Sequence, residues 1–324
     1  MPAVYSIAFD EETNKRIIDR LKLKETYPDA SNTLSIAELQ ANYNSLTYWI
    51  HQELKPKHHT LFAAPSISYL FWDGITKSDP TCENMHLAPN QGNKATQIFI
   101  DEQIAEGHLD PQVESTPGKV NQTLLVHGNY VHKDMQALFR YLIYFNSIQE
   151  GVFKYGNVKL LAWLTPTDVL KYTGITSQYR KSNSFIANCY ADIDVIAYSN
   201  SKKDKKVERS LSLFKDAIKL PEKEGQPDVC LIEMQSNHNK CNVKHQEEFD
   251  FVVHKLCMLS ATPISSSCKL LGPGADEYFA EVLPQNILKK SAADLTEHEM
   301  ALISEEFYLW PFKPDFRMEL YMEH

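Results

Sequence analysis

The segment HGNY, residues 127–130, holds side chains that are well placed to bind a ligand. It follows the apolar run from Leu124 to Val126, which predicts a buried strand. Loops at the carboxyl ends of strands in an α/β sheet are where ligands bind. The ring of Tyr130 can stack on a base, and a half-buried loop aromatic is the structural alternative.

A nucleotide cofactor needs a loop after the first strand whose backbone a ligand can approach closely, and the sequence offers none. The segment AELQANYNSLTYW, residues 37–49, contains no glycine. Every residue with a Cβ narrows this approach and resists a positive φ. The second strand ends in Ala63 and Ala64, where an acid would normally hold ribose hydroxyls. Two independent features of a cofactor site are therefore missing.

Three polar residues could be remnants of a cofactor pocket. Asp101 ends the predicted strand 96–101 and could reach the amino group of an adenine, or act as a helix N-cap or turn residue. Asn129 follows the next predicted strand, and Glu38 lies in the glycine-free segment 37–49. We assign these three residues to a vestigial cofactor pocket and expect it to hold no cofactor.

Two basic segments are candidates for nucleic-acid contact, although the chain has a formal net charge of -9. The segment 171–183, KYTGITSQYRKSN, interleaves tyrosines with cations, and 201–209, SKKDKKVER, carries five positive and two negative side chains. Bases can stack on aromatic rings while Lys and Arg follow phosphates; solvated surface loops are the alternative. Because the whole chain is acidic, any nucleic-acid contact must come from such local basic patches or be made jointly with a partner that supplies the positive field. The candidates are Lys171, Tyr172, Tyr179, Arg180, Lys181, Lys202, Lys203, Lys205 and Lys206.

Other motifs give weaker signals. His238, Cys241 and His245 have metal-like spacing, but a structural zinc site usually needs four ligands and no fourth is evident, so we expect no metal. The six cysteines form no C-x-x-C pair, which indicates reduced thiols. No G-x-S-x-G, P-loop or H-E-x-x-H motif is present.

Short apolar runs alternate with segments of helical period, such as 43–54 and 132–148. This alternation predicts an α/β fold with a mostly parallel, doubly wound sheet of seven strands, covered by helices on both faces. The polar stretch 74–95 is predicted to be a surface loop. The predicted strands are 34–39, 59–64, 96–101, 123–128, 158–164, 194–199 and 228–234.

The pattern becomes purely helical after about residue 235. TEHE, residues 296–299, is a capping box, with Thr296 as N-cap and Glu299 three residues on. No apolar run approaches 18 residues, so we expect no membrane span. The predicted organisation is an α/β domain over 1–235, a linker over 236–246, a small all-helical domain over 247–315 and a tail over 316–324.

Two segments resemble the KsgA-type rRNA adenine N6-dimethyltransferases. GNY at 128–130 looks like a shortened G-N-L-P-Y, the motif with which that family holds a flipped adenine beside S-adenosylmethionine. YRKSNSFIANCYADIDVIAYS, residues 179–199, resembles the family's segment after strand five. The resemblance implies a Rossmann-like class I methyltransferase sheet.

A closer similarity is to the fungal mitochondrial transcription factor B branch of that superfamily. NVKLLAWLTP (157–166), LIEMQ (231–235), LKKSAADLTEHEM (288–300) and WPFKPD (310–315) carry it. The resemblance implies a non-catalytic initiation factor that binds the phage-type mitochondrial RNA polymerase and traps unpaired promoter DNA. It further implies work in the mitochondrial matrix, as a monomer outside the polymerase complex.

In that branch the C-terminal tail reaches the polymerase cleft, which makes Phe312, Lys313, Phe316 and Arg317 candidate contacts; a tail packed on the helical domain is the alternative. The N-terminus lacks the character of a cleavable presequence, so the import route is not predicted. Two other functions stay open: an active rRNA adenine dimethyltransferase that uses S-adenosylmethionine, and a scaffold in mitochondrial ribosome assembly.

Overall fold

The computed structural model describes residues 7–64, 67–89, 96–199, 204–222 and 226–316, without the side chains of 96–99 and 134. The chain forms two compact units. The sheet unit takes in Met1–Val169 and Asp192–Ser236, and the helical unit takes in Leu170–Ala191 and Asn237–His324. This division differs from the predicted boundaries, because 170–191 groups with the helical unit rather than with the first domain.

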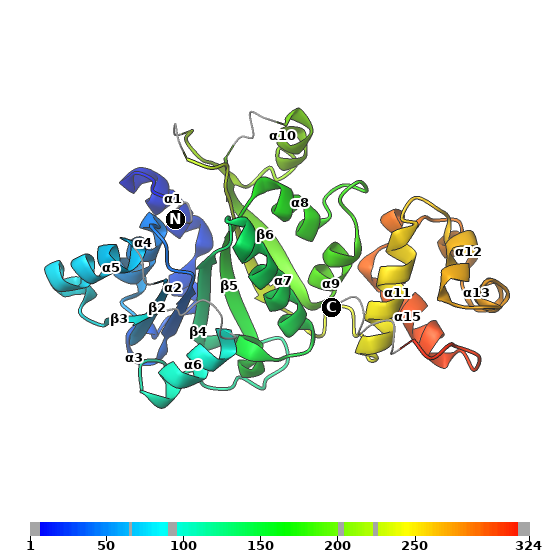
Figure 1. Ribbon diagram of the computed structural model, residues 1–324, viewed down its shortest axis with the longest axis horizontal. Helices are drawn as coiled ribbons and strands as arrows, with labels where there is room; N and C mark the ends of the chain where they lie inside the picture. Colours follow the sequence, from blue (N-terminus) through cyan, green and yellow to red (C-terminus); the bar gives the residue numbers. More distant parts are fainter. Residues whose placement is uncertain (1–6, 65–66, 90–95, 200–203, 223–225, 317–324) are drawn as a thin grey trace. The chain divides into compact units, whose positions relative to one another are not determined.

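Eight strands form one sheet, in the order β3-β2-β1-β4-β5-β8-β6-β7 (Figure 1). Neighbours from β3 to β5 are parallel, while β8 runs antiparallel to β5. Two of the eight strands were not predicted: β3, and β7, which has two residues. The strands are β1 (Ser35–Leu39), β2 (His58–Ala63), β3 (Met85–Pro89), β4 (Val120–Asn129), β5 (Asn157–Leu164), β6 (Ala191–Tyr198), β7 (Ile218–Lys219) and β8 (Cys230–Ser236).

The strand order reverses between β1 and β4, the switch point where doubly wound sheets bind ligands. Leu39, the last residue of β1, is opposite Gly128, and Asn129, the last residue of β4, is opposite Trp163. The ends of β1, β4 and β5 therefore lie side by side. We call this border of the sheet the carboxyl edge.

Helices pack on the sheet through apolar stripes. Ile17 of α1 and Leu46 and Ile50 of α4 join a buried cluster with Leu125 and Leu161 of the sheet. The helices predicted over 43–54 and 132–148 are confirmed as α4 and α7. The helices of this part of the chain are α1 (Glu11–Leu21), α2 (Leu23–Thr26), α3 (Ala30–Thr33), α4 (Ser45–Leu54), α5 (Ile67–Ser78), α6 (Thr96–Ala105), α7 (Lys133–Ser147), α8 (Pro166–Thr173) and α10 (Lys205–Leu211), with 3-10 turns at Pro80–Cys82 and Gly151–Tyr155.

Two predictions along 74–101 are wrong. Residues 96–101 begin helix α6 instead of forming a strand, and the third strand is β3, inside the stretch predicted to be a loop. A short apolar run does not distinguish a strand from a buried helix. The residues after 101, EQIA, continue the helix, while the edge strand β3 fully buries only Met85 and Ala88 and so lacks a clear apolar signal.

The helical unit is built around a core of its own. In α15, Met300, Ile303 and Phe307 are buried, and the capping box of Thr296 and Glu299 is confirmed. Its helices are α9 (Ser182–Tyr190), α11 (Gln246–Met258), α12 (Ile264–Ser267), α13 (Ala275–Val282), α14 (Gln285–Leu288) and α15 (Glu297–Leu309), with 3-10 turns at Cys268–Leu271 and Ala292–Asp294.

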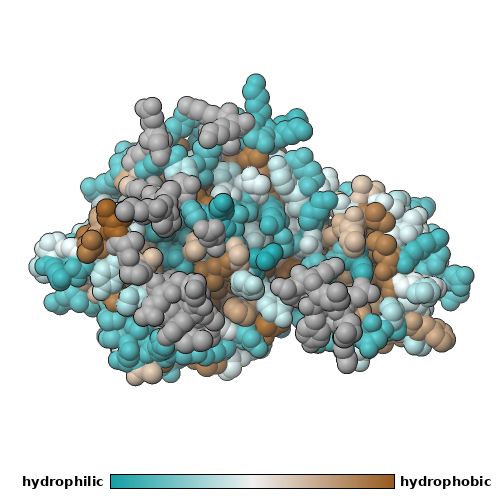
Figure 2. Space-filling model, in the orientation of Figure 1, coloured by the Kyte–Doolittle hydropathy of each residue, from teal (hydrophilic) through white to brown (hydrophobic). Residues whose placement is uncertain are grey.

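The described surface is mainly polar. On the face shown in Figure 2, hydrophilic residues cover most of the described area and apolar residues form smaller groups between them. Within the ranges that the structure describes, no helix has the length and hydropathy needed to cross a bilayer.

Candidate functional site

The loop between β1 and α4 is held by its own contacts. Gln40 has a φ of 60°, so a side-chain-bearing residue occupies the left-handed region that favours glycine. The Ala41 amide donates to the Phe62 carbonyl (3.0 Å), and the indole Nε1 of the buried Trp72 donates to the Asn42 carbonyl (3.0 Å). The Asn44 side chain caps α4 by accepting from the Leu46 amide. These bonds tie the loop to β2 and α5.

Glu38 faces the interior of the sheet unit instead of a pocket. Its carboxylate, fully buried, accepts from the Thr47 hydroxyl (2.6 Å) and lies 3.2 Å from Nδ1 of His127. Burial by itself raises the pKa of Glu38, but the charge and hydrogen bond of His127 lower it to about 2. The assignment of Glu38 to a vestigial cofactor pocket is therefore corrected: its side chain ties β1 to α4 and β4.

Asn129 and Tyr130 lie at the carboxyl edge, at the end of β4. The Tyr130 amide donates to the Trp163 carbonyl (2.8 Å), and the Asn129 side chain accepts from the Val131 amide (3.2 Å). Among the described residues, Nδ2 of Asn129 and the hydroxyl of Tyr130 are buried without a hydrogen-bond partner. A Cβ at Gly128 would collide with the Tyr130 hydroxyl and the Leu39 carbonyl. The phenol therefore fills the space between the ends of β1 and β4.

The burial of Tyr130 corrects its predicted role. Its ring is 0% exposed and packs against Phe139, with ring centroids 5.3 Å apart. Burial, and then the charge of Glu38, raise the pKa of the phenol well above its ordinary value. A ring without an exposed face offers nothing for a base to stack on in this conformation.

Asp101 is also displaced from its predicted place. It lies on α6, is exposed, and forms an ion pair with Lys154 (3.0 Å). Because the segment is helical, Asp101 does not end a strand of the sheet.

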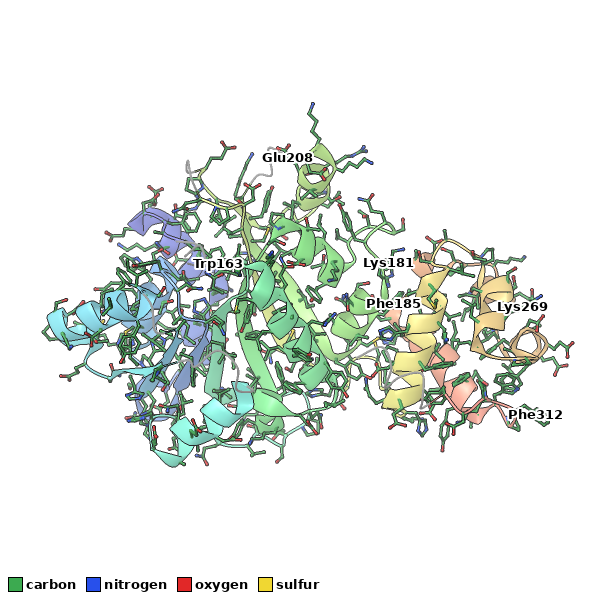
Figure 3. All side chains as sticks on the ribbon, viewed as in Figure 1. Trp163, Lys181, Phe185, Glu208, Lys269 and Phe312 are labelled. Carbon is green, nitrogen blue, oxygen red and sulfur yellow. The ribbon has the colours of Figure 1, made fainter. Side chains whose placement is uncertain are left out.

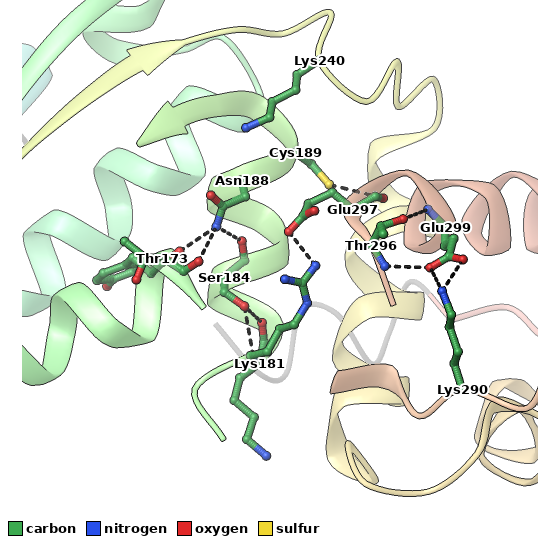
Figure 4. A network of polar contacts seen from close by, with 12 residues as sticks. Thr173, Lys181, Ser184, Asn188, Cys189, Lys240, Lys290, Thr296, Glu297 and Glu299 are labelled. Carbon is green, nitrogen blue, oxygen red and sulfur yellow. Dashed lines mark hydrogen bonds and ion pairs between the residues drawn. The ribbon is translucent and has the colours of Figure 1, made fainter. Parts of the chain in front are cut away.

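The side chains of the basic segment 171–183 differ in exposure: some are buried and others face solvent. Tyr172 is 2% exposed and belongs to the core, so its predicted base contact is corrected. Arg180 pairs with Glu297 (2.7 Å) and lies over the ring of Phe185. Figure 4 shows Glu297 within the network of polar contacts in this region. Lys171 and Tyr179 are half-buried, whereas Lys181 is exposed.

Lys181 borders a groove of about 630 Å³ in the helical unit, which we call the basic groove. Lys289, also exposed, lines it together with the hydroxyl-bearing residues Ser177, Ser260 and Ser291, and Lys181 donates to the Ser260 hydroxyl (2.5 Å). The acid on the wall, Asp294, accepts a hydrogen bond from Ser291. Sequence reasoning missed Lys289, although it stands in the segment 288–300 that carries the family resemblance.

The second basic segment is described only in part. Lys202 and Lys203 lie outside the described residues. Lys205 and Lys206 are exposed in the first turn of α10, where Asp204 is the N-cap.

The residues predicted for the C-terminal tail separate into exposed and packed side chains. Phe312, labelled in Figure 3, is 83% exposed. Lys313 pairs with Glu248 (3.2 Å) and lies over the Tyr308 ring. Phe316 is buried and stacks on Phe251 in the core of the helical unit, so its predicted outward contact is corrected. Arg317 lies outside the described residues.

His238, Cys241 and His245 do not form a group with metal-ligand spacing in the described part of the chain. Cys241 is buried in the helical core, and the His245 ring stacks on Tyr308, with centroids 3.3 Å apart. These two side chains are used for packing.

The comparisons with known proteins agree with this geometry. The chain is 24% identical over 312 residues to Mitochondrial transcription factor 1 of Saccharomyces cerevisiae, covering 94% of this chain and 88% of the relative. It is 27% identical over 325 residues to the protein of the same name from Lachancea kluyveri, covering 97% and 92%. The predicted resemblance is confirmed. No protein-family model matches the chain.

The fold has a match among solved structures. The crystal structure of a dimethyladenosine transferase from Plasmodium falciparum superimposes with a TM-score of 0.59 at 10% identity, covering 94% of this chain and 98% of that one. The predicted fold class, a methyltransferase-like sheet followed by a helical region, is therefore confirmed.

Proposed function

We propose that this chain is a non-catalytic mitochondrial transcription initiation factor that binds mitochondrial RNA polymerase and stabilises melted promoter DNA. One observation carries the proposal: relatives named Mitochondrial transcription factor 1 align over 94% and 97% of the chain. A match of this extent includes both the sheet unit and the helical unit. The same names support a mitochondrial location, and we assign the protein to the matrix.

The carboxyl edge supports the absence of catalysis. A methyltransferase must hold its cofactor's sulfonium in line with the target nitrogen, because positioning supplies much of the rate. Here Tyr130 fills the space between β1 and β4, Gln40 replaces a flexible turn residue, and the end of β2 has no acid. These residues do not fit S-adenosylmethionine, and the proposal routes no chemical step through it.

The basic groove supports the contact with unpaired DNA. Lys181 and Lys289 supply charge for phosphates, and the serine hydroxyls can donate to phosphate oxygens. The same segment of the chain as Lys181 also contains Lys171, Tyr179 and Arg180. A second, smaller basic site consists of Lys205 and Lys206. Phe312 and Lys313 remain the proposed tail contacts with the polymerase.

The energies indicate that this protein acts jointly with the polymerase. A stacked base contributes about 1–3 kcal/mol. Opening one duplex step costs about 1.4 kcal/mol. A few contacts on a chain of net charge -9 therefore offset only one or two melted steps. The factor should stabilise a bubble that the polymerase also grips.

Run-off transcription tests the proposal. With the cognate mitochondrial RNA polymerase, the protein should be required on a duplex promoter and nearly dispensable on a template whose start site is already unpaired. The pre-melted template controls for polymerase activity. Equal transcription with and without the protein on duplex DNA would contradict the proposal.

The alternative function, rRNA adenine dimethylation, is favoured by the fold match to a dimethyladenosine transferase. Calorimetry with S-adenosylmethionine separates the two functions. The proposed factor should show no heat of binding at micromolar cofactor, while an active enzyme should bind and should label rRNA adenines from a radioactive methyl donor.

A further inference from the structure

Three side chains with metal-ligand chemistry meet at the β3 border of the sheet, outside the basic groove. His86 comes from β3, and Glu106 and His108 follow α6. Their imidazole nitrogens and carboxylate oxygen all lie within 4.8 Å of one another. In the described part of the chain, this is the one group of three that has such spacing.

The end of α6 is shaped to bring Glu106 and His108 together. Gly107 has a φ of 80°, its amide donates to the Ile104 carbonyl (3.1 Å), and the His108 amide donates to the Gln103 carbonyl (2.9 Å). This pair of bonds is a Schellman motif, with glycine at its left-handed position. The turn folds His108 back beside the last turn of the helix.

One residue of the sheet connects this turn to β3. Thr60 of β2 is the register partner of His86, and its hydroxyl donates to the His108 carbonyl (2.9 Å). The two histidines, far apart in the sequence, are therefore positioned by the same strand residue.

The two imidazoles stack on each other, so their rings must turn before they can share an ion. Their rings are nearly parallel, 17° apart, with centroids separated by 3.4 Å. A ring nitrogen binds a metal ion in the plane of its ring, and the spacing of the ligand atoms, within 4.8 Å of one another, is short enough for a shared zinc once the rings turn.

The side chain of Gln103 contacts both His108 and Glu106. Its buried amide oxygen lies 3.1 Å from Nδ1 of His108, and its amide nitrogen donates to the Glu106 carboxylate (2.9 Å). Ligands of metal ions are oriented by outer partners of this kind. When Nδ1 of His108 donates to Gln103, the lone pair on Nε2 is left for an ion.

We infer that His86, Glu106 and His108 bind a divalent transition-metal ion, with Zn²⁺ as the expected ion and water in the fourth position. Two imidazoles and one carboxylate are ligands that zinc, cobalt and nickel prefer over magnesium or calcium. Such an ion would join β3 to the end of α6.

Calorimetric titration of the full chain with ZnCl₂ tests the inference. We expect one equivalent to bind with micromolar or tighter affinity. His86→Asn and His108→Asn should each weaken binding at least tenfold. His298→Asn, which changes an exposed histidine of α15, is the matched control and should bind as the wild type does. Circular dichroism confirms that each variant is folded.

Cobalt provides a second measurement that needs no variant. Co²⁺ bound to the wild-type chain should show visible bands of nitrogen and oxygen ligation. Strong thiolate charge-transfer absorption would place the ion on cysteines and overturn the inference. The same conclusion would follow if the wild type bound no zinc, or if both histidine variants bound it as tightly as the wild type.

Discussion

The carboxyl edge of the sheet and the basic groove of the helical unit share a sequence signal but differ in accessibility. The segments 127–130 and 171–183, which contribute to these two regions, were each predicted from aromatic residues that stand beside polar or charged ones. At the carboxyl edge, the aromatic ring of Tyr130 is buried and its hydroxyl has no partner among the described residues. At the basic groove, Lys181 and Lys289 remain exposed beside serine hydroxyls. The sheet keeps the architecture of a ligand site, whereas the groove keeps groups that a ligand can reach.

The difference supports the proposal that this methyltransferase-like fold acts without a cofactor. Tyr130 fills the carboxyl edge, and a hydrogen bond from Trp72 holds the loop between β1 and α4. Contacts within the protein therefore take the place of contacts with a ligand. A ligand cannot reach the strand ends in this arrangement, and the sheet remains well packed. On this proposal, nucleic acid binds to surfaces outside the strand ends.

The largest expected effect is on stability at the carboxyl edge. Tyr130→Ala should lower the free energy of unfolding by about 3–5 kcal/mol, because removing a large aromatic side chain from a core leaves a cavity. Tyr130→Phe is the matched control: it removes only the unpaired hydroxyl, so stability should stay the same or rise by up to about 1 kcal/mol. Urea unfolding measures both. A marked loss in Tyr130→Phe would reveal a partner for the hydroxyl and would break the contrast with the groove.

The buried histidines His51 and His59 predict a pH dependence of stability. Burial, and then the neighbouring His59, lower the pKa of His51 from 6.5 to about 4. The unfolded chain takes up this proton below pH 6.5 and the folded chain does so only near pH 4. The stability from the neutral ring is therefore full above pH 6.5 and is lost as the pH falls to about 4, a change of about 3 kcal/mol.

Unfolding measured between pH 7 and pH 4 checks this expectation. His51→Asn should flatten the profile in that range, and His298→Asn should leave it unchanged because His298 is exposed. Glu38 acts in a lower window, from its ordinary 4.5 to about 2, where its carboxylate becomes protonated. An unchanged slope in His51→Asn would show that other groups carry the pH dependence.

The smallest expected change is in DNA binding at the basic groove. Lys181→Glu combined with Lys289→Glu should weaken binding of single-stranded DNA about tenfold. The slope of the logarithm of the binding constant against the logarithm of the salt concentration should become shallower by about 1.4, because two phosphate contacts are lost. Lys205→Glu combined with Lys206→Glu is the charge-matched control and should have the smaller effect. Fluorescence anisotropy over a salt series measures both pairs. Equal losses would mean that the groove is not a distinct site.

Local pattern was sufficient for most of the fold. Six of the seven predicted strands match strands of the sheet, since each has a run of buried apolar residues with turn residues at its ends. The segment 96–101 failed because its six residues satisfy either a strand or a helix. The candidate site was harder to predict, because Tyr130, Tyr172 and Phe316 look like surface aromatics in the chain but are buried by segments distant in sequence.

Residue types alone already excluded a glycine-rich cofactor loop and a ribose-binding acid, because no folding step can add a missing glycine or carboxylate. They also contained the family resemblance that the comparisons confirm. Packing in three dimensions settled which aromatic rings are accessible, and it brought Lys181 beside Lys289 and His86 beside His108. Those outcomes depend on contacts between remote segments, and periodicity along the chain carries no information about such contacts.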